Sequence, residues 1–392
     1  MVVTSEHGEG RSELGRLLLA SQALTSDWAP ALAAVPRSEF LPDLIWPFDM
    51  DTGRSIAVRR TDDPVAWHRH ANANEPIVTQ WDDGNHDGPE PGRVATSSAS
   101  MPSVVFSMLR DLDVHPGQRA LEIGTGTGWN AALLAHRIGA AQVHSVEVDP
   151  AVAATARKAL HAFGMPVDVA CGDGLLGHAP TAPYDRVIAT VGLRTLPHTW
   201  VNQTRPGGVI VAPWGTDYAR QDAVVRLVVS EDGTSASGRF TGPVEFMKLR
   251  SQRRPWPRHN EYVPAAGVSG GDISSTRLVE DDFVRETFDA LRFVLGLRVP
   301  DCLCAVAEKR EGTRPVWLYG LTDRSWACVI FRDGEPESRV YQGGSRRLWD
   351  ETEAAYAWWQ THGEPGYDRL GLTVTAEETR AWLDEPADSW TA

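Results

Sequence analysis

The chain has 392 residues, of which 42% are hydrophobic and 23% charged, a composition typical of a soluble globular protein whose length predicts two domains. The formal net charge of −14 excludes general binding to nucleic-acid phosphates, because such binding depends on basic side chains. The sequence has no run of 18 apolar residues, no secretory signal layout and no CxxC pair. We therefore expect a cytoplasmic protein with reduced thiols, no membrane partner and no nucleic-acid partner.

Residues 1–93 are expected to form short helices followed by a long polar insertion. SELGRLLLASQAL has apolar residues at helical spacing, and DWAPALAAVPRSEFLPD predicts a second short helix that ends near its prolines. From Asp49 to Gly92 the residues favour a surface loop with one strand in EPIVTQW. The histidines and acidic residues of this loop lack the spacing of metal-binding motifs, so we predict no metal.

Residues 94–249 alternate between short apolar runs and helical stretches, which predicts a parallel sheet with helices on both faces. The predicted parallel strands are RALEIG, QVHSVEVD, VDVACGD, DRVIATV and GGVIVAPWG. Two further strands, in AVVRLVVSEDG and GRFTGPVEFMKL, are expected to pair antiparallel at a sheet edge.

Residues 250–272 are rich in Arg, Pro and Gly and are interpreted as a linker to an α+β domain over 273–392. STRLVEDDFVRETFDALRFVLGL predicts one helix, and four antiparallel strands should follow it. Eight of the 15 tryptophans lie beyond residue 250; we expect most of them in the core, with one or two available to a peptide partner. The last helix should place one set of residues on a single face: Leu348, Trp349, Thr352, Ala355, Tyr356 and Trp359.

The most informative motif is ALEIGTGTGWNAALLA, where a strand runs through a glycine-rich turn into a helix. Gly124, Gly126 and Gly128 allow the backbone to turn sharply and to approach a ligand closely. The phosphate-binding lysine of a GKS or GKT sequence is missing, which excludes a P-loop.

Two acidic residues after the next strands indicate which ligand the turn binds. Glu147 lies about 23 residues after Gly124, where a carboxylate can hold two ribose hydroxyls, and Asp173 can accept from an adenine amino group. NAD and S-adenosylmethionine both fit these acids, but the GxGxG spacing and the preceding Glu122 favour S-adenosylmethionine, whose sulfonium a carboxylate attracts. The predicted cofactor-binding residues are Glu122, Gly124, Thr125, Gly126, Thr127, Gly128, Glu147, Asp173 and Gly174.

The motifs resemble the protein L-isoaspartyl O-methyltransferase family over roughly residues 12–230, in its order and spacing: LEIGTGTGWNAALLA, SVEVDP, CGDG and RPGGVIVAPWG. The family's Thr-Ile-Ser-x-Pro segment is matched by residues 98–102, SASMP. The resemblance implies that Ser100, with Ser98 as a second candidate, holds the substrate carboxylate beside the methyl donor. It also implies a Rossmann-like class I S-adenosylmethionine-dependent methyltransferase core, here with an added α+β C-terminal domain.

The chain departs from the usual single-domain repair enzyme by its polar insertion and by about 140 C-terminal residues. GLTVTAEETRAWLDEP and AVPRSEFLP are similar to family members that tailor lanthipeptide, lasso peptide and graspetide precursors. This implies methylation of an aspartate in a dedicated ribosomal precursor peptide, whose ester closes to aspartimide. The alternatives are repair of L-isoaspartyl or D-aspartyl residues in damaged proteins and an inactive peptide-binding protein. The identity of the peptide, the preference for Asp or isoAsp, any need for prior cyclisation and the oligomeric state stay open.

Overall fold

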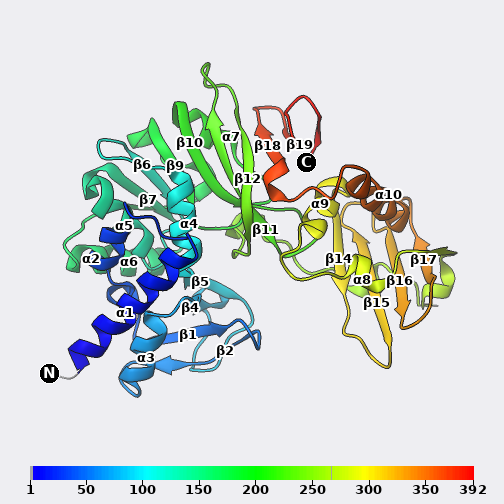
Figure 1. Cartoon of the computed structure of the whole chain (residues 1–392), viewed down its shortest axis with the longest axis horizontal. Coiled ribbons are helices and arrows are strands. Elements are labelled where there is room, and N and C mark those ends of the chain that lie inside the picture. Colours follow the sequence, from blue (N-terminus) through cyan, green and yellow to red (C-terminus); the bar gives the residue numbers. More distant parts are fainter. Residues whose placement is uncertain (1–2, 266) are drawn as a thin grey trace. The chain divides into compact units, whose positions relative to one another are not determined.

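The structure is a computed structural model that describes residues 3–265 and 267–392 (Figure 1). Its contacts divide the chain into two compact units. Unit 1 comprises the chain up to Val191 together with Pro197–Ala212 and Arg226–Ala236. Unit 2 comprises Gly192–Leu196, Pro213–Val225 and Ser237–Ala392. Residues 1–93 thus share a unit with most of the predicted core, and the predicted linker lies within unit 2.

The centre of unit 1 is a parallel sheet in the order β10-β9-β6-β7-β8. The order reverses between β6 and β9, which is the arrangement of a doubly wound fold and confirms the predicted fold class. The sheet is built from β6 (Ala120–Ile123), β7 (Val143–Glu147), β8 (Asp168–Cys171), β9 (Tyr184–Ala189) and β10 (Thr204–Trp214). Its helices are α4 (Pro102–Leu112), α5 (Trp129–Ile138), α6 (Pro150–Ala162) and α7 (His198–Asn202).

A second, smaller sheet of unit 1 occupies much of the region predicted as a polar loop. It contains β1 (Leu44–Asp49), β2 (Arg54–Ser55), β3 (Val58–Arg59), β4 (Ile77–Trp81) and β5 (Ala95–Ala99), with helix α3 (Pro64–Ala71) between β3 and β4. The strand in EPIVTQW is confirmed as β4, but the prediction of a loop around it was wrong. A few widely spaced apolar residues, among them Ile45, Trp67 and Ile77, are enough to form a buried cluster between polar stretches.

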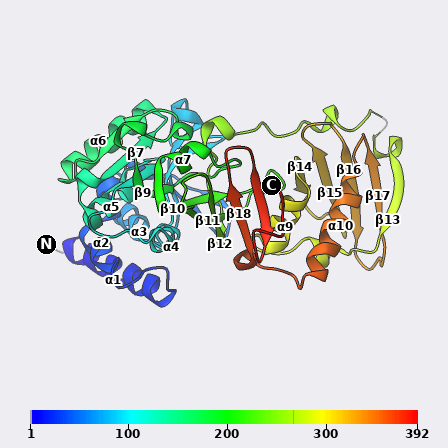
Figure 2. The ribbon, with the colours of Figure 1, turned by 90° about the horizontal axis from the view of Figure 1, so that it is seen from above.

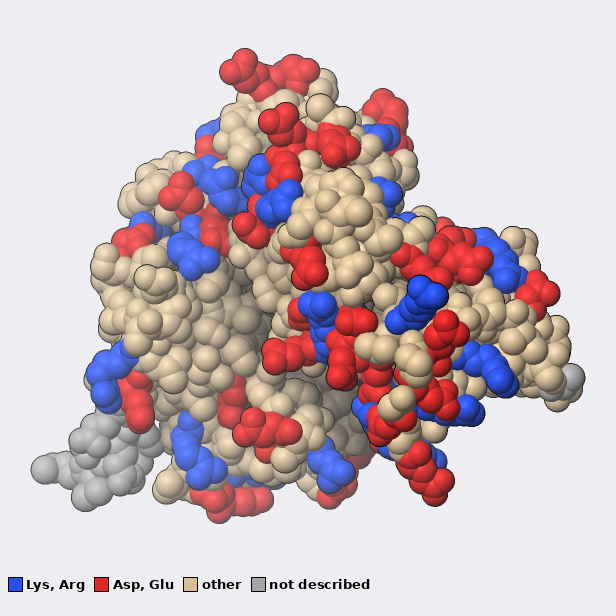
Figure 3. Space-filling view, turned by 45° about the vertical axis from the view of Figure 1, so that its right-hand side comes forward, with Lys and Arg blue, Asp and Glu red and all other residues tan. Residues whose placement is uncertain are grey.

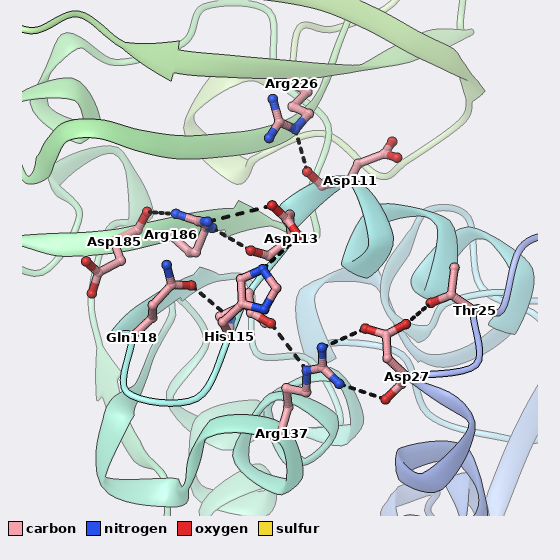
Figure 4. A network of polar contacts seen from close by, with 11 residues as sticks. Thr25, Asp27, Asp111, Asp113, His115, Gln118, Arg137, Asp185, Arg186 and Arg226 are labelled. Atoms are coloured by element: carbon pink, nitrogen blue, oxygen red, sulfur yellow. Dashed lines mark hydrogen bonds and ion pairs between the residues drawn. The ribbon is translucent and has the colours of Figure 1, made fainter.

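The N-terminal helices α1 (Val3–Ala20) and α2 (Ala29–Ala34) are connected to the core by a polar network (Figure 4). Arg137 on α5 donates to the carboxylate and to the main-chain oxygen of Asp27, at 2.6 and 2.8 Å. A hydrogen bond from Thr25 and the charge of Arg137 lower the pKa of Asp27. In the same network, Arg186 donates to the main-chain oxygen of Asp113 at 3.0 Å. The N-terminal segment is therefore an integral part of unit 1.

Unit 2 contains an antiparallel sheet in the order β13-β17-β16-β15-β14, with α10 packed against β15, β16 and β17 (Figure 2). The six residues predicted on one face of the last helix are the buried residues of α10, which confirms that prediction. The elements are β13 (Asp272–Thr276), β14 (Cys302–Val306), β15 (Thr313–Gly320), β16 (Trp326–Arg332), β17 (Ser338–Gly343) and α10 (Leu348–Thr361).

The prediction of a single helix near the start of this domain was wrong. The structure has β13 and two shorter helices, α8 (Glu280–Phe283) and α9 (Ala290–Arg298). Asp289 starts the second of them, because its side chain accepts a hydrogen bond from the main-chain nitrogen of Leu291 at 2.8 Å. A capping residue inside an apolar helical pattern thus ends the continuity that the pattern predicts.

The strands predicted at a sheet edge are β11 (Asp222–Val229) and β12 (Ala236–Val244). Within unit 2, however, β12 is followed in the sheet by β18 (Leu370–Val374), β19 (Thr379–Leu383) and β20 (Ser389–Thr391), so it is not an edge strand. Four of the eight C-terminal tryptophans lie in the core, where the sequence predicted most of them: Trp326, Trp349, Trp359 and Trp382 are at most 3% exposed. Trp256 is 56% exposed.

None of the helices in the described ranges combines the length and the apolarity that a membrane crossing requires. On the face drawn in Figure 3, Asp and Glu side chains are interspersed with Lys and Arg. That face therefore carries charges of both signs.

Candidate functional site

The glycine-rich turn between β6 and α5 forms a cradle that is half-buried at Gly124, Gly126 and Thr127. Gly124, Gly126 and Gly128 have φ values of +94°, +53° and +89°, in the left-handed region that costs other residues about 1–2 kcal/mol. A Cβ atom at Gly124 would lie 2.7 Å from Cγ1 of Val191, and one at Gly126 would lie 3.3 Å from the main-chain oxygen of Ser98. Side chains at these two positions would therefore press against Val191 and against the serine-rich segment, which is why glycine is required there.

The turn lies where the strand order reverses, between the carboxyl ends of β6 and β9, which is where such sheets bind ligands. Thr190 follows β9; its main-chain nitrogen donates to the oxygen of Ile123 at 2.9 Å, and its hydroxyl donates to the oxygen of Gly124. Thr190 and Val191 were not among the predicted site residues. The sequence signal for them is the end of the strand DRVIATV, once that strand is placed beside β6.

Glu147, at the end of β7, is 8% exposed and is held by two main-chain donors. Oε2 accepts from the nitrogen of Gly126 and Oε1 from the nitrogen of Asp149, both at 3.0 Å. A carboxylate offers about four lone-pair positions, so each oxygen still has one for a ligand hydroxyl. This geometry fits the predicted contact with two ribose hydroxyls.

Asp173 and Gly174 lie beyond the end of β8, next to the strand that carries Glu147. Asp173 is exposed and caps the 3-10 turn Gly174–Leu176, because Oδ1 accepts from the nitrogen of Leu175 at 3.0 Å. Gly174 is buried, and its oxygen accepts from Nε1 of Trp200 at 2.8 Å. The structure thus brings the residues predicted for ribose and adenine to neighbouring strand ends.

Glu122 lies beneath the glycine turn and has no exposed surface. Asn130 Nδ2 donates to Oε1 at 2.7 Å and Ser145 Oγ donates to Oε2 at 2.5 Å. Burial raises the pKa of Glu122 to about 7, against the opposing effect of these two hydrogen bonds. Because Glu122 is fully buried, a ligand lying on the turn would not contact it directly.

The two predicted threonines of the turn occupy different environments. Thr125 is 4% exposed, and its hydroxyl lies 2.6 Å from the hydroxyl of Ser145, which in turn donates to Glu122. Thr127 is half-buried, and its Oγ1 accepts from the nitrogen of Trp129 at 3.5 Å. Thr125 therefore belongs to the polar layer below the turn, whereas Thr127 stabilises the start of α5.

The serine-rich segment forms β5 (Ala95–Ala99) and continues to Ser100; it lies next to the glycine turn, because a Cβ atom at Gly126 would be 3.3 Å from the main-chain oxygen of Ser98. Ser98 and Ser100 are half-buried, and across residues 3–265 and 267–392 their hydroxyls make no hydrogen bond to another residue. Ser97 is 7% exposed and accepts from the Thr79 hydroxyl at 3.2 Å. The structure thus brings the predicted substrate serines and the predicted cofactor turn together, with two hydroxyls available.

Arg37, which the sequence did not single out, holds the end of β5 in place. Its NH2 donates to the main-chain oxygens of Ala99 and Glu75, each at 2.9 Å, and its guanidinium lies 5.7 Å from the ring centroid of Trp129. Burial lowers the pKa of Arg37 to about 9, so it stays charged at neutral pH. It connects the residue before Ser100 to the first residue of α5.

Comparison with known proteins supports the same assignment. The family profile named Protein-L-isoaspartate(D-aspartate) O-methyltransferase (PCMT) matches residues 88–254. The protein-L-isoaspartate O-methyltransferase of Pyrococcus horikoshii is 38% identical over 156 residues, which are 40% of this chain and 70% of that protein. The Thermococcus onnurineus protein of the same name is 37% identical over 152 residues, 38% of this chain and 68% of that protein.

A solved structure titled protein-L-isoaspartate O-methyltransferase superposes with a TM-score of 0.54 and 21% identity, covering 96% of this chain and all of that one. This likeness concerns the fold. The cofactor is S-adenosylmethionine, and the glycine cradle, the remaining lone pairs of Glu147 and the exposed carboxylate of Asp173 fit it. The identity of 38% extends over 70% of the Pyrococcus protein, and the range that the family profile matches includes the serine segment and the glycine turn. On this basis the chain belongs to the protein-L-isoaspartate O-methyltransferase family.

Proposed function

We propose that this chain methylates an aspartate side chain of a dedicated ribosomal precursor peptide and that the resulting ester closes to aspartimide. The observation that carries the carboxyl-methylation part of the proposal is the meeting of β5 with the glycine turn at Ser98 and Gly126. The hydroxyls of Ser98 and Ser100, which make no hydrogen bond to another described residue, support the proposal because they belong to the segment next to the turn that would hold the methyl donor.

The residues of the site have to align and desolvate the reactants rather than move a proton. An aspartate carboxylate, with a reference pKa near 4, is already ionised at neutral pH, so the reaction requires no general base. S-adenosylmethionine supplies a methyl group on a positively charged sulfur. Glu147, Asp173 and the main chain of the glycine turn would hold it, and correct positioning contributes roughly 7–11 kcal/mol to such reactions.

Ser100, with Ser98 as the second candidate, would donate a hydrogen bond to one carboxylate oxygen so that the other oxygen faces the methyl group. Arg37 would act as a positioning residue, because it fixes the main-chain oxygen of Ala99 immediately before Ser100. The methylated aspartate is neutral, and its ester carbonyl is open to attack by the next main-chain nitrogen. That step releases methanol, forms a five-membered imide and requires no group from the protein.

The choice of a dedicated peptide is supported by residues that the curated relatives do not match. The Pyrococcus protein aligns with 40% of this chain, and unit 2 contributes much of the remainder. β13 lies at the edge of its sheet with four of its five residues exposed, including Ile273 at 63%. An edge strand with free main-chain groups can pair with an extended peptide.

Repair of L-isoaspartyl residues is the second candidate. The names of the relatives favour it, and a solved structure with that name has a fold that covers 96% of this chain, including most of unit 2.

The decisive experiment measures release of S-adenosylhomocysteine with three substrates. These are an isoaspartyl peptide, the same peptide with normal aspartate, and peptides translated from short reading frames adjacent to the gene. Turnover with an adjacent-gene peptide, accompanied by a product lighter than the substrate by one water, supports the proposal. Turnover confined to the isoaspartyl peptide would establish repair.

The role of Ser100 is tested with Ser100→Ala, for which we expect at least a tenfold lower kcat with an unchanged affinity for S-adenosylmethionine. The expected decrease in kcat corresponds to the loss of one hydrogen bond to a charged group, which is worth about 1.5–3 kcal/mol. Ser107→Ala is the matched control, since Ser107 is also half-buried but lies on α4. Equal turnover of the two variants would remove Ser100 from the mechanism.

A further inference from the structure

A group of potential metal ligands lies in unit 1 at the amino ends of β7 and β8, away from the glycine turn at the carboxyl ends. His144 is the second residue of β7, Asp168 is the first residue of β8, and His178 precedes the 3-10 turn Ala179–Thr181. Asp168 Oδ2 lies 3.2 Å from Nδ1 of His144 and 3.8 Å from Nε2 of His178. All three ligand atoms lie within 4.8 Å of one another.

We propose that His144, Asp168 and His178 bind one divalent transition-metal ion of the zinc type. Two imidazoles and one carboxylate are ligands that zinc and its neighbours prefer, whereas calcium and magnesium prefer oxygen ligands. Tetrahedral zinc with bonds of about 2.0–2.2 Å requires ligand atoms about 3.3–3.6 Å apart. The distances of 3.2 and 3.8 Å lie on either side of this range, so small side-chain movements would complete the geometry.

Ordinary hydrogen bonding explains one part of this arrangement. His144 can donate to Asp168 across 3.2 Å, but the 3.8 Å from His178 to the same oxygen is too long for a hydrogen bond. The two imidazole rings are nevertheless stacked at an interplanar angle of 22°, with centroids 6.0 Å apart. A shared cation accounts for both imidazoles facing one carboxylate oxygen.

The main chain holds the three residues in position without a metal. His144 and Asp168 are direct partners in the parallel pairing of β7 and β8. The nitrogen of His178 donates to Oε1 of Gln203 at 2.8 Å, and the Tyr184 hydroxyl donates to the oxygen of His178 at 2.5 Å. The Asp168 side chain is 59% exposed, so an ion has a path from solvent and a water molecule can complete its coordination.

A metal ion at this place would connect two strands to the segment that follows Asp173 and Gly174. Asp173, the residue predicted to contact adenine, lies five positions before His178, with one short turn between them. The ion would therefore have a structural role and would stabilise the cofactor side of unit 1 without taking part in methyl transfer.

The test uses the full chain without a histidine tag, stripped of metal and titrated separately with Zn²⁺ and Co²⁺. We expect calorimetric binding of one Zn²⁺ per chain and the visible absorption of four-coordinate Co²⁺. His178→Gln and Asp168→Asn should each weaken binding at least tenfold, since even residues that merely orient a ligand are worth 10–100-fold. His161→Gln, a change of an exposed histidine on α6, should leave binding unchanged.

Each contrary result is informative. Absence of heat and of Co²⁺ absorption at 100 μM metal, a concentration of the order used for weak sites, would overturn the proposal. Binding that persists equally in His178→Gln and Asp168→Asn would place the ion elsewhere and would overturn it too. Circular dichroism of both variants distinguishes lost binding from lost folding, and Asp168→Asn, a change at an exposed side chain, guards against unfolding. The proposal does not depend on the identity of the methylated peptide.

Discussion

Each unit of the chain contains a carboxylate with no exposed surface, and the two have opposite kinds of hydrogen-bond partner. Glu122 in unit 1 accepts from the uncharged side chains of Asn130 and Ser145. Asp222 in unit 2 accepts from Lys248 and, at 3.1 Å, from Arg194. Both carboxylates are therefore fully buried, but Glu122 has neutral partners and Asp222 has cationic ones.

The difference corresponds to what lies next to each carboxylate. Asp222 connects the segment that begins at Gly192 with the segment around Lys248, whose main chains also form a parallel bridge, and its cations cancel its charge. Glu122 lies under the turn that would hold a positively charged methyl donor, where a cationic partner would cancel the attraction. Neutral donors hydrogen-bond the carboxylate of Glu122 without cancelling its charge when it is ionised.

The largest effect is expected for Lys248→Met, which removes one cation from Asp222. Because Asp222 has no access to water, unit 2 should lose about 3–5 kcal/mol of stability, measured by hydrogen exchange of the β11 amides. Lys309→Met is the control: Lys309 pairs with Glu280 and Asp333 but is 35% exposed, so water screens these pairs and its loss should cost much less stability than the loss of Lys248. Equal losses of stability in the two variants would mean that burial does not determine how much these ion pairs stabilise the protein.

The next effect is a pH dependence that originates at Glu122. Its pKa rises from 4.5 to about 7 on folding, so the folded state keeps a proton that the unfolded state releases. The stability contributed by the protonated form is fully present below about pH 4.5 and is lost as the pH rises through about 7, a change of about 3 kcal/mol. Unfolding of unit 1 in urea at pH 5 and pH 8 measures it.

Glu122→Gln supplies the comparison for that experiment, because it cannot ionise. At low pH, where Glu122 is protonated, the two proteins should have similar free energies of unfolding. At high pH, where Glu122 is charged, the variant should be the more stable of the two. A parallel pH profile of both proteins would show that Glu122 keeps its charge throughout, and the contrast with Asp222 would then lose its basis.

The smallest effect on stability is expected at Gly126, where a substitution tests the backbone shape of the glycine turn separately from the charge of Glu122. Gly126→Ala should cost about 1–2 kcal/mol in stability because φ is +53°, and it should also weaken S-adenosylmethionine binding at least tenfold. Gly139→Ala is the matched control, since Gly139 has φ +89° but a Cβ there would meet nothing within 4 Å. It should lose similar stability and keep its affinity, as measured by calorimetry.

The sequence predicted the parts of the molecule that depend on local patterns. The parallel strands, the glycine turn and the buried face of α10 follow from periodicity and motif spacing within short windows. Glu147 was predicted from its distance along the chain to the turn, and the structure adds that it holds the nitrogen of Gly126.

The remainder depends on contacts between distant residues. Arg37 reaches Ala99 across 62 positions, and Thr190 reaches Gly124 across 66, which no periodicity reveals. The small sheet of unit 1 was not predicted, because its strands are short and it contains few apolar residues. The cluster of His144, Asp168 and His178 was not predicted either. Its residues share no spacing motif, and His144 and Asp168 meet only through the register of β7 and β8.

Arg37 also determines how far the protein can be shortened. The family profile begins at residue 88, yet the guanidinium that binds the main-chain oxygens of Ala73, Glu75 and Ala99 lies about fifty positions upstream. A fragment cut to the matched range would leave the oxygen of Ala99 and the indole nitrogen of Trp129, which donates to Val35, without their buried partners. The range that the family profile matches is therefore shorter than the smallest piece that can be expected to fold.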